Sequence, residues 1–448
     1  MAQRIHILGL GKSGVGAALL ARRKGFDVSA TDMKEAGALP EYEALKSAGV
    51  RLDLGQHDPD LFREADLIIV SPGVGKVGLL EQAAASGVRV ISEVEFAAGM
   101  MASGIIAVTG TNGKSTVTTM IADIMKKGPA PVWAGGNLGT ALSGAVGGEV
   151  DTPEGWVVLE LSSFQLERIE VFRPRVAMIL NITPDHFDRY ATLDDYAAAK
   201  CNIFRNQGKR DHLLIPGGND EIRHRCTAAR SVLHAIGGED GELRLEDGII
   251  RVRGLGGPEV DIDPARCNLK NSLLISNAMF AIAASILAGA GTQQVVEGLA
   301  AFKPLRHRFQ LVDEIDGVRW INDSKATNPE SAIKAIEAAG RNVILLAGGL
   351  GKGLDFSPLA GGVRGRVKAA ILFGKSAGEI RGVIEPEVGV EEVSSLRRAM
   401  ERARALASAG DTVLLAPGCA SFDMFRNFED RGDRFISLVH ELKEKAQV

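Results

Sequence analysis

Short apolar runs alternate with longer amphipathic stretches along most of this chain. Such runs stand at Arg4–Leu8, Leu67–Val70, Gly104–Thr109, Asn342–Ala347 and Thr412–Leu415. The alternation is typical of parallel β-sheets covered by helices, because parallel strands need a crossover connection. Glycine-rich or polar motifs directly follow most of these runs, and open α/β sheets bind ligands at the carboxyl ends of their strands. We therefore expect an α/β fold with its functional residues at strand ends.

The apolar runs fall into three groups. A chain of 448 residues is long enough for about three domains. Boundaries near Ala98 and Lys303 predict domains over residues 1–98, 99–303 and 304–448. We expect Rossmann-like N-terminal and C-terminal domains around a central α/β domain of the P-loop type. In the central domain, strands flanking Glu246-Asp247-Gly248 predict a hairpin at the edge of the sheet.

Charge and composition exclude several classes of protein. The formal net charge is -4 and no long Lys/Arg run occurs, which speaks against a nucleic-acid binder. The apolar start breaks at Gly9, so we expect no signal peptide, and no apolar run approaches the ~20 residues that cross a membrane. The four cysteines are far apart, which fits a reducing cytoplasm better than zinc or disulfides.

The first motif, Gly9-Leu10-Gly11-Lys12-Ser13-Gly14, follows a predicted strand and precedes a helix, and Asp32 ends the next strand. Glycines let a diphosphate approach the backbone, and a helix N-terminus favours its charge. A nicotinamide cofactor, another nucleotide diphosphate and a turn without ligand all remain compatible with this motif. A second loop, Ser71-Pro72-Gly73, is placed to close the other side of the same site.

A second glycine loop runs from Gly110 to Thr116, with the sequence Gly-Thr-Asn-Gly-Lys-Ser-Thr. Backbone N–H groups in such a loop can hold the β- and γ-phosphates of ATP, Lys114 can neutralise them, and Ser115 or Thr116 can bind magnesium. Val108 stands where the strict pattern has its first glycine, so the loop is a shorter variant. The alternative is an ordinary helix start with a surface lysine.

Three later residues carry possible chemistry. Glu160 ends a predicted strand, where a carboxylate suits magnesium. His186 follows the next strand, and by its spacing alone it is as compatible with packing as with ligation. Lys200 by itself has the pattern of a solvated helix residue.

The strings T-G-T-N-G-K-S-T, E-L-S-S-F-Q and N-I-T-P-D-H-F-D-R-Y resemble motifs of the Mur ligase family. The resemblance extends along nearly the whole chain. It implies an ATP-dependent amide-bond ligase that uses two Mg2+ ions. It also implies catalytic roles for Lys114, Glu160, His186 and Lys200. The implied metal ligands are Ser115, Glu160, His186 and a carbamylated Lys200.

Further motifs of the C-terminal domain carry the same resemblance, among them Pro304–Phe309 and Ala416–Asp423. They imply D-glutamate as the added amino acid and UDP-N-acetylmuramoyl-L-alanine as its acceptor, with no nucleic-acid or membrane partner. We expect a monomer. The implied D-glutamate site consists of Thr327, Lys352, Ser421 and Phe422. The implied ATP site consists of Gly110, Thr111, Asn112, Gly113, Lys114, Ser115, Thr116, Asn277, Arg308 and Asp323.

The implied contacts to the UDP-linked substrate come from both earlier domains. They are Gly11, Lys12, Ser13, Gly14, Asp32, Met33, Lys34, Ser71, Pro72, Gly73, Asn137, Ser162, Gln165 and His186. One stretch departs from the family pattern, in which G-x-H-N-x-x-N precedes an Ala-rich helix. Here Leu273 and Leu274 replace the His-Asn pair and only Asn277 remains, so adenine is expected to be held differently.

Three rivals stay open at this point. A sister ligase would take another amino acid, a nicotinamide-dependent oxidoreductase would rest on Gly9–Gly14 alone, and a non-catalytic regulator would bind nucleotide without releasing phosphate.

Overall fold

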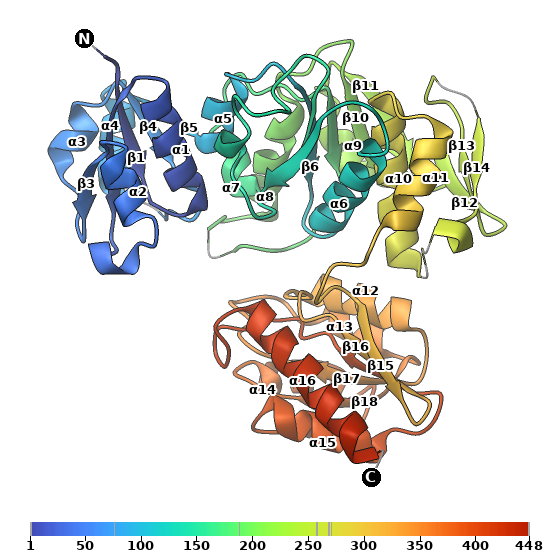
Figure 1. The fold of residues 1–448 in the computed structure, drawn as a ribbon. Coiled ribbons are helices and arrows are strands. Elements are labelled where there is room, and N and C mark those ends of the chain that lie inside the picture. Colours follow the sequence, from blue (N-terminus) through green and yellow to red (C-terminus); the bar gives the residue numbers. More distant parts are fainter. Residues whose placement is uncertain are drawn as a thin grey trace. The chain divides into compact units, whose positions relative to one another are not determined.

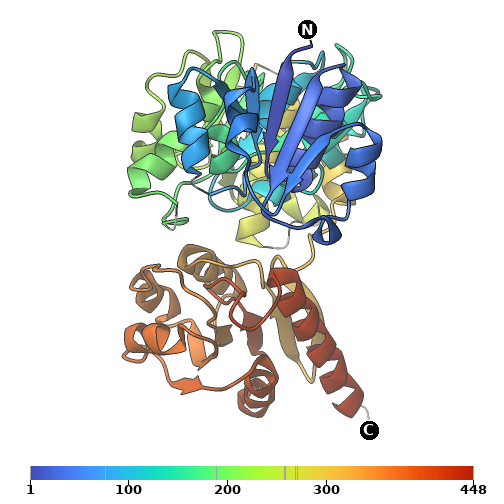
Figure 2. The same ribbon diagram turned by 90° about the vertical axis from the view of Figure 1, so that its left-hand side faces the viewer.

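The computed structural model describes residues 2–75, 77–187, 189–256, 259–267, 269 and 271–446. It contains three β-sheets with helices packed on them (Figure 1), and Figure 2 gives a second view of the same elements. The chain divides into two compact units. The first comprises Met1–Ile182, Asp194–Lys270 and Ser276–Phe302. The second comprises Thr183–Leu193, Asn271–Ile275 and Lys303–Val448.

The N-terminal sheet is fully parallel, with the strand order β3-β2-β1-β4-β5. Its strands are β1 (Arg4–Leu8), β2 (Asp27–Asp32), β3 (Arg51–Leu54), β4 (Leu67–Val70) and β5 (Arg89–Ser92). Its helices are α1 (Lys12–Arg23), η1 (Ala36–Ala38), α2 (Tyr42–Ser47), α3 (Pro59–Arg63), α4 (Gly78–Ala85) and α5 (Glu93–Ala98).

Alternate residues of β1 enter two different cores. Ile5 and Ile7 pack with residues of α1, whereas Leu8 packs with Phe62 of α3 and Leu80 of α4. The sheet is therefore covered on both faces, as expected for parallel strands. Because Leu8 pairs with Thr31 on one side and Val70 on the other, the loops that follow β1, β2 and β4 meet at one edge.

The central sheet has nine strands in the order β14-β13-β12-β11-β10-β9-β6-β8-β7. The strands are β6 (Gly104–Thr109), β7 (Val132–Gly136), β8 (Trp156–Glu160), β9 (Val176–Ile179), β10 (His212–Pro216), β11 (Val232–Ile236), β12 (Leu243–Glu246), β13 (Ile249–Val252) and β14 (Val260–Ile262). The helices are α6 (Lys114–Met125), η2 (Leu142–Gly144), α7 (Ser163–Leu166), α8 (Leu193–Cys201), η3 (Asn202–Phe204), α9 (Asp220–Arg225), η4 (Pro264–Cys267), α10 (Ser272–Leu287) and α11 (Thr292–Ala301).

Strand β6 lies in the interior of this sheet, between β8 and β9, and all six of its residues are buried. The predicted hairpin is confirmed, since β12 and β13 pair antiparallel. Its turn has positive φ angles at Asp247 (50°) and Gly248 (79°), which matches the twist of adjoining strands. Strand β14 lies outside the hairpin and forms the edge of the sheet.

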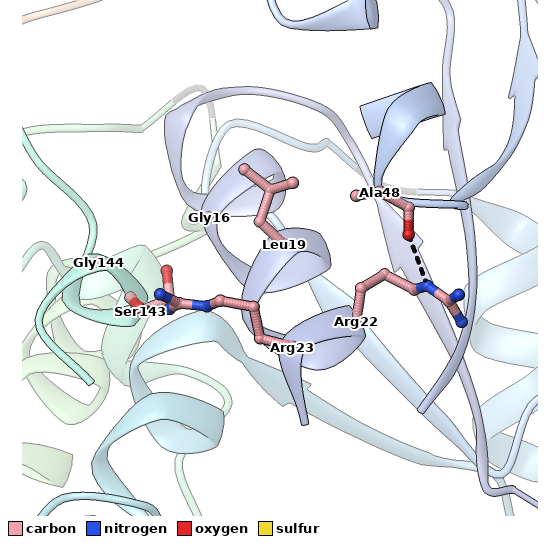
Figure 3. Close-up of a pocket in the computed structure, with 7 residues that line it drawn as sticks. All are labelled: Gly16, Leu19, Arg22, Arg23, Ala48, Ser143 and Gly144. Atoms are coloured by element: carbon pink, nitrogen blue, oxygen red, sulfur yellow. Dashed lines mark hydrogen bonds between the residues drawn. The ribbon is translucent and has the colours of Figure 1, made fainter. Parts of the chain in front are cut away.

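Helices α1 and α5 of the N-terminal domain pack against η2 of the central domain within the first unit. Glu95 accepts hydrogen bonds from the backbone N–H groups of residues 170, 171 and 172. Arg23 donates to the Ser143 carbonyl at 3.2 Å. A hollow of about 500 Å³ lies at this joint. In Figure 3, Arg23 points toward Ser143 and Arg22 toward Ala48. Its lining contains none of the expected site residues.

The C-terminal sheet has the order β15-β16-β20-β17-β18-β19, with only β15 antiparallel to its neighbour. Its strands are β15 (Gln310–Ile315), β16 (Val318–Asn322), β17 (Val343–Ala347), β18 (Val367–Leu372), β19 (Val390–Glu392) and β20 (Thr412–Leu415). Its helices are α12 (Pro329–Ala339), α13 (Pro358–Val363), α14 (Ala377–Ile384), α15 (Leu396–Leu406) and α16 (Phe428–Ala446).

The central position of β20 brings three loops of this domain together. Leu415 pairs with Asn322 of β16 and with Leu346 of β17, so the loops after β16, β17 and β20 leave the same edge of the sheet. One core under the sheet contains Leu345 and Leu414, and the core on the other face contains Trp320 and Phe435. In the described part of the chain, no helix has the length and apolar character to cross a membrane.

Candidate active site

The first glycine loop has two positions that only glycine fits. Gly9 adopts a φ of 86°, and a Cβ on Gly14 would lie 1.8 Å from the Gly9 carbonyl oxygen. The helix can therefore start close to the strand only if residue 14 has no side chain. Gly11 and Ser71 adjoin, because a Cβ on Gly11 would lie 3.4 Å from the Ser71 hydroxyl. The structure thus brings the loops after β1 and β4 together, as expected.

Asp32 is bound to the backbone of its own loops. One carboxylate oxygen accepts a hydrogen bond from the Leu10 N–H at 2.6 Å, and the other accepts from the Lys34 N–H at 2.9 Å. These bonds brace the glycine loop and occupy both oxygens of the expected ligand contact. Met33, the next residue, has 64% of its surface exposed.

The second glycine loop is held by Asn181, which follows β9. The Asn181 carbonyl accepts from the Thr111 N–H at 3.0 Å, and its side-chain oxygen accepts from the Asn112 N–H at 2.8 Å. Its Nδ2 donates to the Asn112 carbonyl at 3.1 Å. We did not predict a site role for Asn181, although its position directly after a central strand was the signal for one.

Two lysines converge on this loop. The Nζ atoms of Lys114 and Lys200 each donate to the Gly110 carbonyl at 2.9 Å, and Lys114 also donates to the Thr111 carbonyl. Lys200 is only 1% exposed, and its ammonium lies 4.4 Å from the centre of the Tyr196 ring. The interpretation of Lys200 as a solvated residue is therefore wrong, because α8 packs against the phosphate loop.

Glu160 and Asn137 also meet here. Asn137 donates its Nδ2 to Glu160 Oε1 at 2.7 Å. Glu160 is 2% exposed, and its Oε2 has no hydrogen-bond partner among the described residues. A buried carboxylate oxygen with a free lone pair fits the oxygen ligands that Mg2+ prefers, and Ser115 and Thr116 of the phosphate loop are also buried.

Ser162 and Gln165 are engaged with each other. The Ser162 side chain accepts from the Gln165 N–H at 3.3 Å, and Gln165 Oε1 accepts from the Ser162 N–H at 3.0 Å. The pair forms a capping box at the start of α7. In this structure their side chains cap a helix beside Glu160, and substrate contact would have to be made by their remaining polar atoms.

Asn277 packs on the phosphate loop. Its Oδ1 would lie 2.7 Å from a Cβ on Gly113, whose φ is 87°. Helix α10 starts at Ser272, where the Asn271 side chain accepts from the Leu274 N–H at 2.9 Å. Leu273 and Leu274 thus lie in its first turn.

His186, Arg308 and Asp323 belong to the second unit, whereas both glycine loops belong to the first. Burial raises the pKa of Asp323 to about 7, which a hydrogen bond from the Phe309 backbone and the charge of Arg308 partly oppose. Arg308 and Asp323 are thus neighbours. His186 has a φ of 57°, and its N–H donates to the Asp185 carboxylate at 2.8 Å.

The four residues expected to surround D-glutamate lie on the three loops at the edge of the C-terminal sheet. Leu350 and Ala420 exchange two backbone hydrogen bonds, and the Gly418 N–H donates to the Ala326 carbonyl at 2.9 Å. Lys352 Nζ lies 5.4 Å from the centre of the Phe422 ring, and Phe422 is 62% exposed. An exposed aromatic ring and a lysine on joined loops suit an anionic ligand.

Within the described ranges, no group of three or more His, Cys, Asp or Glu side chains could hold a metal. The expected magnesium ligands in the first unit are one carboxylate, a hydroxyl and a modified lysine, which do not make such a group. Magnesium commonly keeps few protein ligands and completes its shell with water and phosphate oxygens.

The sheets and the lysine-bearing glycine loop define an α/β protein built to bind nucleotide phosphates. Three family models match the chain. They are the Mur ligase MurD-like N-terminal domain over residues 3–92, the Mur ligase middle domain over residues 108–285, and the Mur ligase glutamate ligase domain over residues 307–419.

Curated relatives match over nearly the whole length. Proteins from Geotalea daltonii, Koribacter versatilis and Myxococcus xanthus are 38%, 38% and 39% identical, over 98%, 99% and 98% of this chain and the same shares of theirs. Each is called UDP-N-acetylmuramoylalanine--D-glutamate ligase. The chain belongs to the Mur ligase family, which confirms the resemblance found in its motifs.

Solved structures show the same fold at low sequence identity. MurF ligase from Thermotoga maritima, in complex with ADP, has a TM-score of 0.63 at 16% identity and covers 99% of this chain and 96% of its own. A pseudomurein peptide ligase type C from Methanothermus fervidus has a TM-score of 0.60 at 16% identity and covers 98% of this chain and 100% of its own. The expected multidomain α/β architecture is confirmed.

Proposed function

We propose that this chain is an ATP-dependent ligase that joins D-glutamate to UDP-N-acetylmuramoyl-L-alanine in peptidoglycan precursor synthesis. The observation that carries the proposal is the shared name of relatives aligned over nearly all of both chains. We also propose that the glycine loop of residues 9–14 binds uridine diphosphate and not a nicotinamide cofactor, as the family resemblance implies. We further propose that the enzyme acts as a monomer in the cytoplasm.

The three predicted domains divide the substrates among them. Residues 1–98 bind the UDP moiety, residues 99–303 bind ATP, and residues 304–448 bind D-glutamate. Each assignment is supported by glycine-rich or polar loops at the carboxyl edge of the corresponding sheet. Arg308 and Asp323 reach ATP from the C-terminal domain.

In the first step, a carboxylate oxygen of the substrate's L-alanine attacks the γ-phosphorus of ATP, and the bond to ADP breaks. The product is an acyl phosphate. Lys114 is the first residue of α6, and its ammonium neutralises the charge of the phosphates. The backbone N–H groups at the start of the helix stabilise the same negative charge. Its present bonds to the Gly110 and Thr111 carbonyls keep the ammonium over the loop.

The free oxygen of Glu160, together with Ser115, is the proposed holder of one magnesium ion, and His186 and carbamylated Lys200 would hold a second. Magnesium would neutralise phosphate charge and orient the oxygens that react. Carbamylation of Lys200 would replace one of two ammonium groups that now share the Gly110 carbonyl with an anionic group. The pocket would thereby gain a metal ligand and lose a like-charge neighbour.

In the second step, the amine of D-glutamate attacks the acyl carbonyl and loses a proton, and inorganic phosphate leaves. Lys352, Thr327 and Ser421 offer donors to the two carboxylates of the amino acid. The Phe422 ring, close to Lys352, covers the apolar part of its side chain. Stabilisation of the tetrahedral oxyanion is electrostatic.

The test is phosphate release from ATP with magnesium and UDP-N-acetylmuramoyl-L-alanine, with amino acids added one at a time. We expect release to depend on D-glutamate and to be absent with L-glutamate, L-lysine or diaminopimelate. Release that depends on another amino acid would favour a sister ligase. Nucleotide binding without release would identify a regulator and contradict the proposal.

A further inference from the structure

Arg431, in the first turn of α16, is a fully buried cation. Its side chain is 0% exposed. It forms no ion pair with a described residue, although most buried charges in proteins are paired, and the nearby Asp423 only partly offsets the cost of its burial. Burial lowers the pKa of its guanidinium to about 10, so it still carries its charge at neutral pH. The start of a helix is an unfavourable place for a cation, which makes the position costlier still.

The hydrogen bonds of its side chain go to two of the loops at the edge of the C-terminal sheet. Nε donates to the Ser324 hydroxyl at 2.9 Å, and Nη2 donates to the Ser324 carbonyl at 2.8 Å. Both Nη1 and Nη2 donate to the Cys419 carbonyl at 3.1 Å. The planar guanidinium thus links the loop after β16 to the loop after β20.

The third loop is also in contact with this group. A Cβ on Gly349, after β17, would lie 3.3 Å from Arg431 Nη1 and 2.4 Å from the Ala420 carbonyl oxygen. Gly349 has a φ of 135°, so its backbone passes the guanidinium in a conformation that other residues rarely adopt. Arg431 therefore touches all three loops that carry Thr327, Lys352, Ser421 and Phe422.

We propose that Arg431 is the positioning residue of the amino-acid site. The inference rests on the proposed D-glutamate site. Arg431 is buried and does not touch the ligand; it sets the spacing of the loops that do.

The test compares Arg431→Lys with Arg402→Lys. The control arginine lies on α15 of the same domain and forms an exposed ion pair with Glu391. Lysine keeps the charge of Arg431 and loses the forked hydrogen bonds, so the exchange is not conservative at such a site. We expect kcat/KM for D-glutamate to fall about 100-fold in Arg431→Lys, mainly through KM. KM for ATP and for the UDP-linked substrate should change less than about twofold.

A second variant covers the case in which Arg431→Lys does not fold. Ser324→Ala removes the hydroxyl that accepts from Nε and donates to the Phe428 carbonyl, and should raise KM for D-glutamate in the same selective way but by less, about tenfold. Equal changes in all three KM values, or no change, in both variants would overturn the proposal.

A readout without catalysis separates this inference from the proposed function. Amide hydrogen exchange should accelerate in residues 324–328, 348–353 and 416–423 of Arg431→Lys and remain unchanged in Arg402→Lys. Unchanged exchange in those loops would contradict the positioning role even if the ligase activity is established. If the wild type releases no phosphate with D-glutamate, the proposed function fails independently of the exchange result.

Discussion

Two helices of this protein begin with the same Gly-Lys-Ser tripeptide after a buried strand, but the glycine backbone and the lysine side chain adopt different conformations in the two. In the first, Gly11 has a φ of -72°, and Lys12 is exposed and donates to no described residue. In the second, Gly113 has a φ of 87°, and Lys114 turns back onto the carbonyls of its own loop. The tripeptide is identical, so the difference arises from the surrounding chain.

Loop length and bracing explain the difference. Three residues separate β1 from α1, whereas four separate β6 from α6. The extra residue allows the backbone of the second loop to bend back on itself, and Asn181 stabilises this conformation through three hydrogen bonds. The first loop is braced by the Asp32 carboxylate instead. A curled loop with a returned lysine suits a triphosphate and an open loop suits a diphosphate, which agrees with the proposed ATP and UDP sites.

The strongest test of this comparison removes each lysine in turn. Lys114→Ala should lower kcat by about 10³-fold, because the lysine stabilises charge on the transferred phosphoryl group. Lys12→Ala should raise KM for the UDP-linked substrate by about tenfold and leave kcat unchanged. Steady-state kinetics with chemical denaturation would show both effects. Ligation retained by Lys114→Ala would break the distinction between the loops.

Magnesium removal should separate the two nucleotide sites. With EDTA, ADP binding should weaken by on the order of 100-fold while UDP binding stays the same, because only the central loop lies near Glu160. Glu160→Gln should raise the magnesium concentration needed for ADP binding by at least about tenfold. Calorimetric titration of UDP to the same variant is the internal control. A parallel loss of UDP binding would mean that the two loops share one metal-dependent site.

Alanine substitutions at the two N-cap glycines, Gly113 and Gly11, should lower the free energy of unfolding by different amounts. Gly113→Ala places a side chain at positive φ and within 2.7 Å of Asn277 Oδ1, and should destabilise by about 2–4 kcal/mol. Gly11→Ala meets only the Ser71 hydroxyl at 3.4 Å, and should cost less than about 1 kcal/mol. Urea unfolding measures both. Equal costs would show that the backbone difference does not govern the loops.

An effect smaller than that of Gly113→Ala is expected at the joint between the domains that carry the two loops. Glu93 is buried there, accepts from the Ser143 N–H at 2.6 Å, and has a pKa raised by burial to about 7. The folded chain holds this proton between about pH 4.5 and 7 while the unfolded chain has lost it, so stability falls as pH rises through that window.

Glu93→Gln should therefore remove about 1–3 kcal/mol of this pH dependence, because its amide is neutral at every pH. Thermal unfolding from pH 5 to 8 measures the effect, with exposed Glu81→Gln as the matched control. If the profile of Glu93→Gln runs parallel to that of the wild type, the buried carboxyl is not titrating in this window.

Much of the fold followed from the sequence, because apolar runs and turn residues specify it locally. β1, β4, β6 and β20 begin and end where predicted. The short strand β3 was not predicted, since Arg51–Leu54 is only partly buried at the edge of its sheet. Helix α16 begins at Phe428, ahead of the amphipathic stretch from Arg434 to Lys445 that indicates a helix in the sequence.

The candidate site was predictable as a set of strand-end loops, and less so as a set of contacts. Nothing in Gly-Lys-Ser distinguishes Gly11 from Gly113, because the sign of φ depends on the packing of Asn181 and Asn277. The burial of Lys200 and Arg431 likewise depends on which distant loops they meet. Ser162 and Gln165 carried a local signal, since Ser-x-x-Gln at a helix start predicts mutual capping. The roles of these residues toward substrate stay predictions.

The most direct test of the proposed chemistry follows an oxygen atom. UDP-N-acetylmuramoyl-L-alanine labelled with ¹⁸O in its carboxylate would be incubated with ATP, magnesium and D-glutamate, and the released phosphate analysed by mass spectrometry. An acyl-phosphate intermediate predicts that each phosphate carries one oxygen from the substrate carboxylate. Phosphate without the label would show that ATP is cleaved by water or at another bond, and would contradict the account.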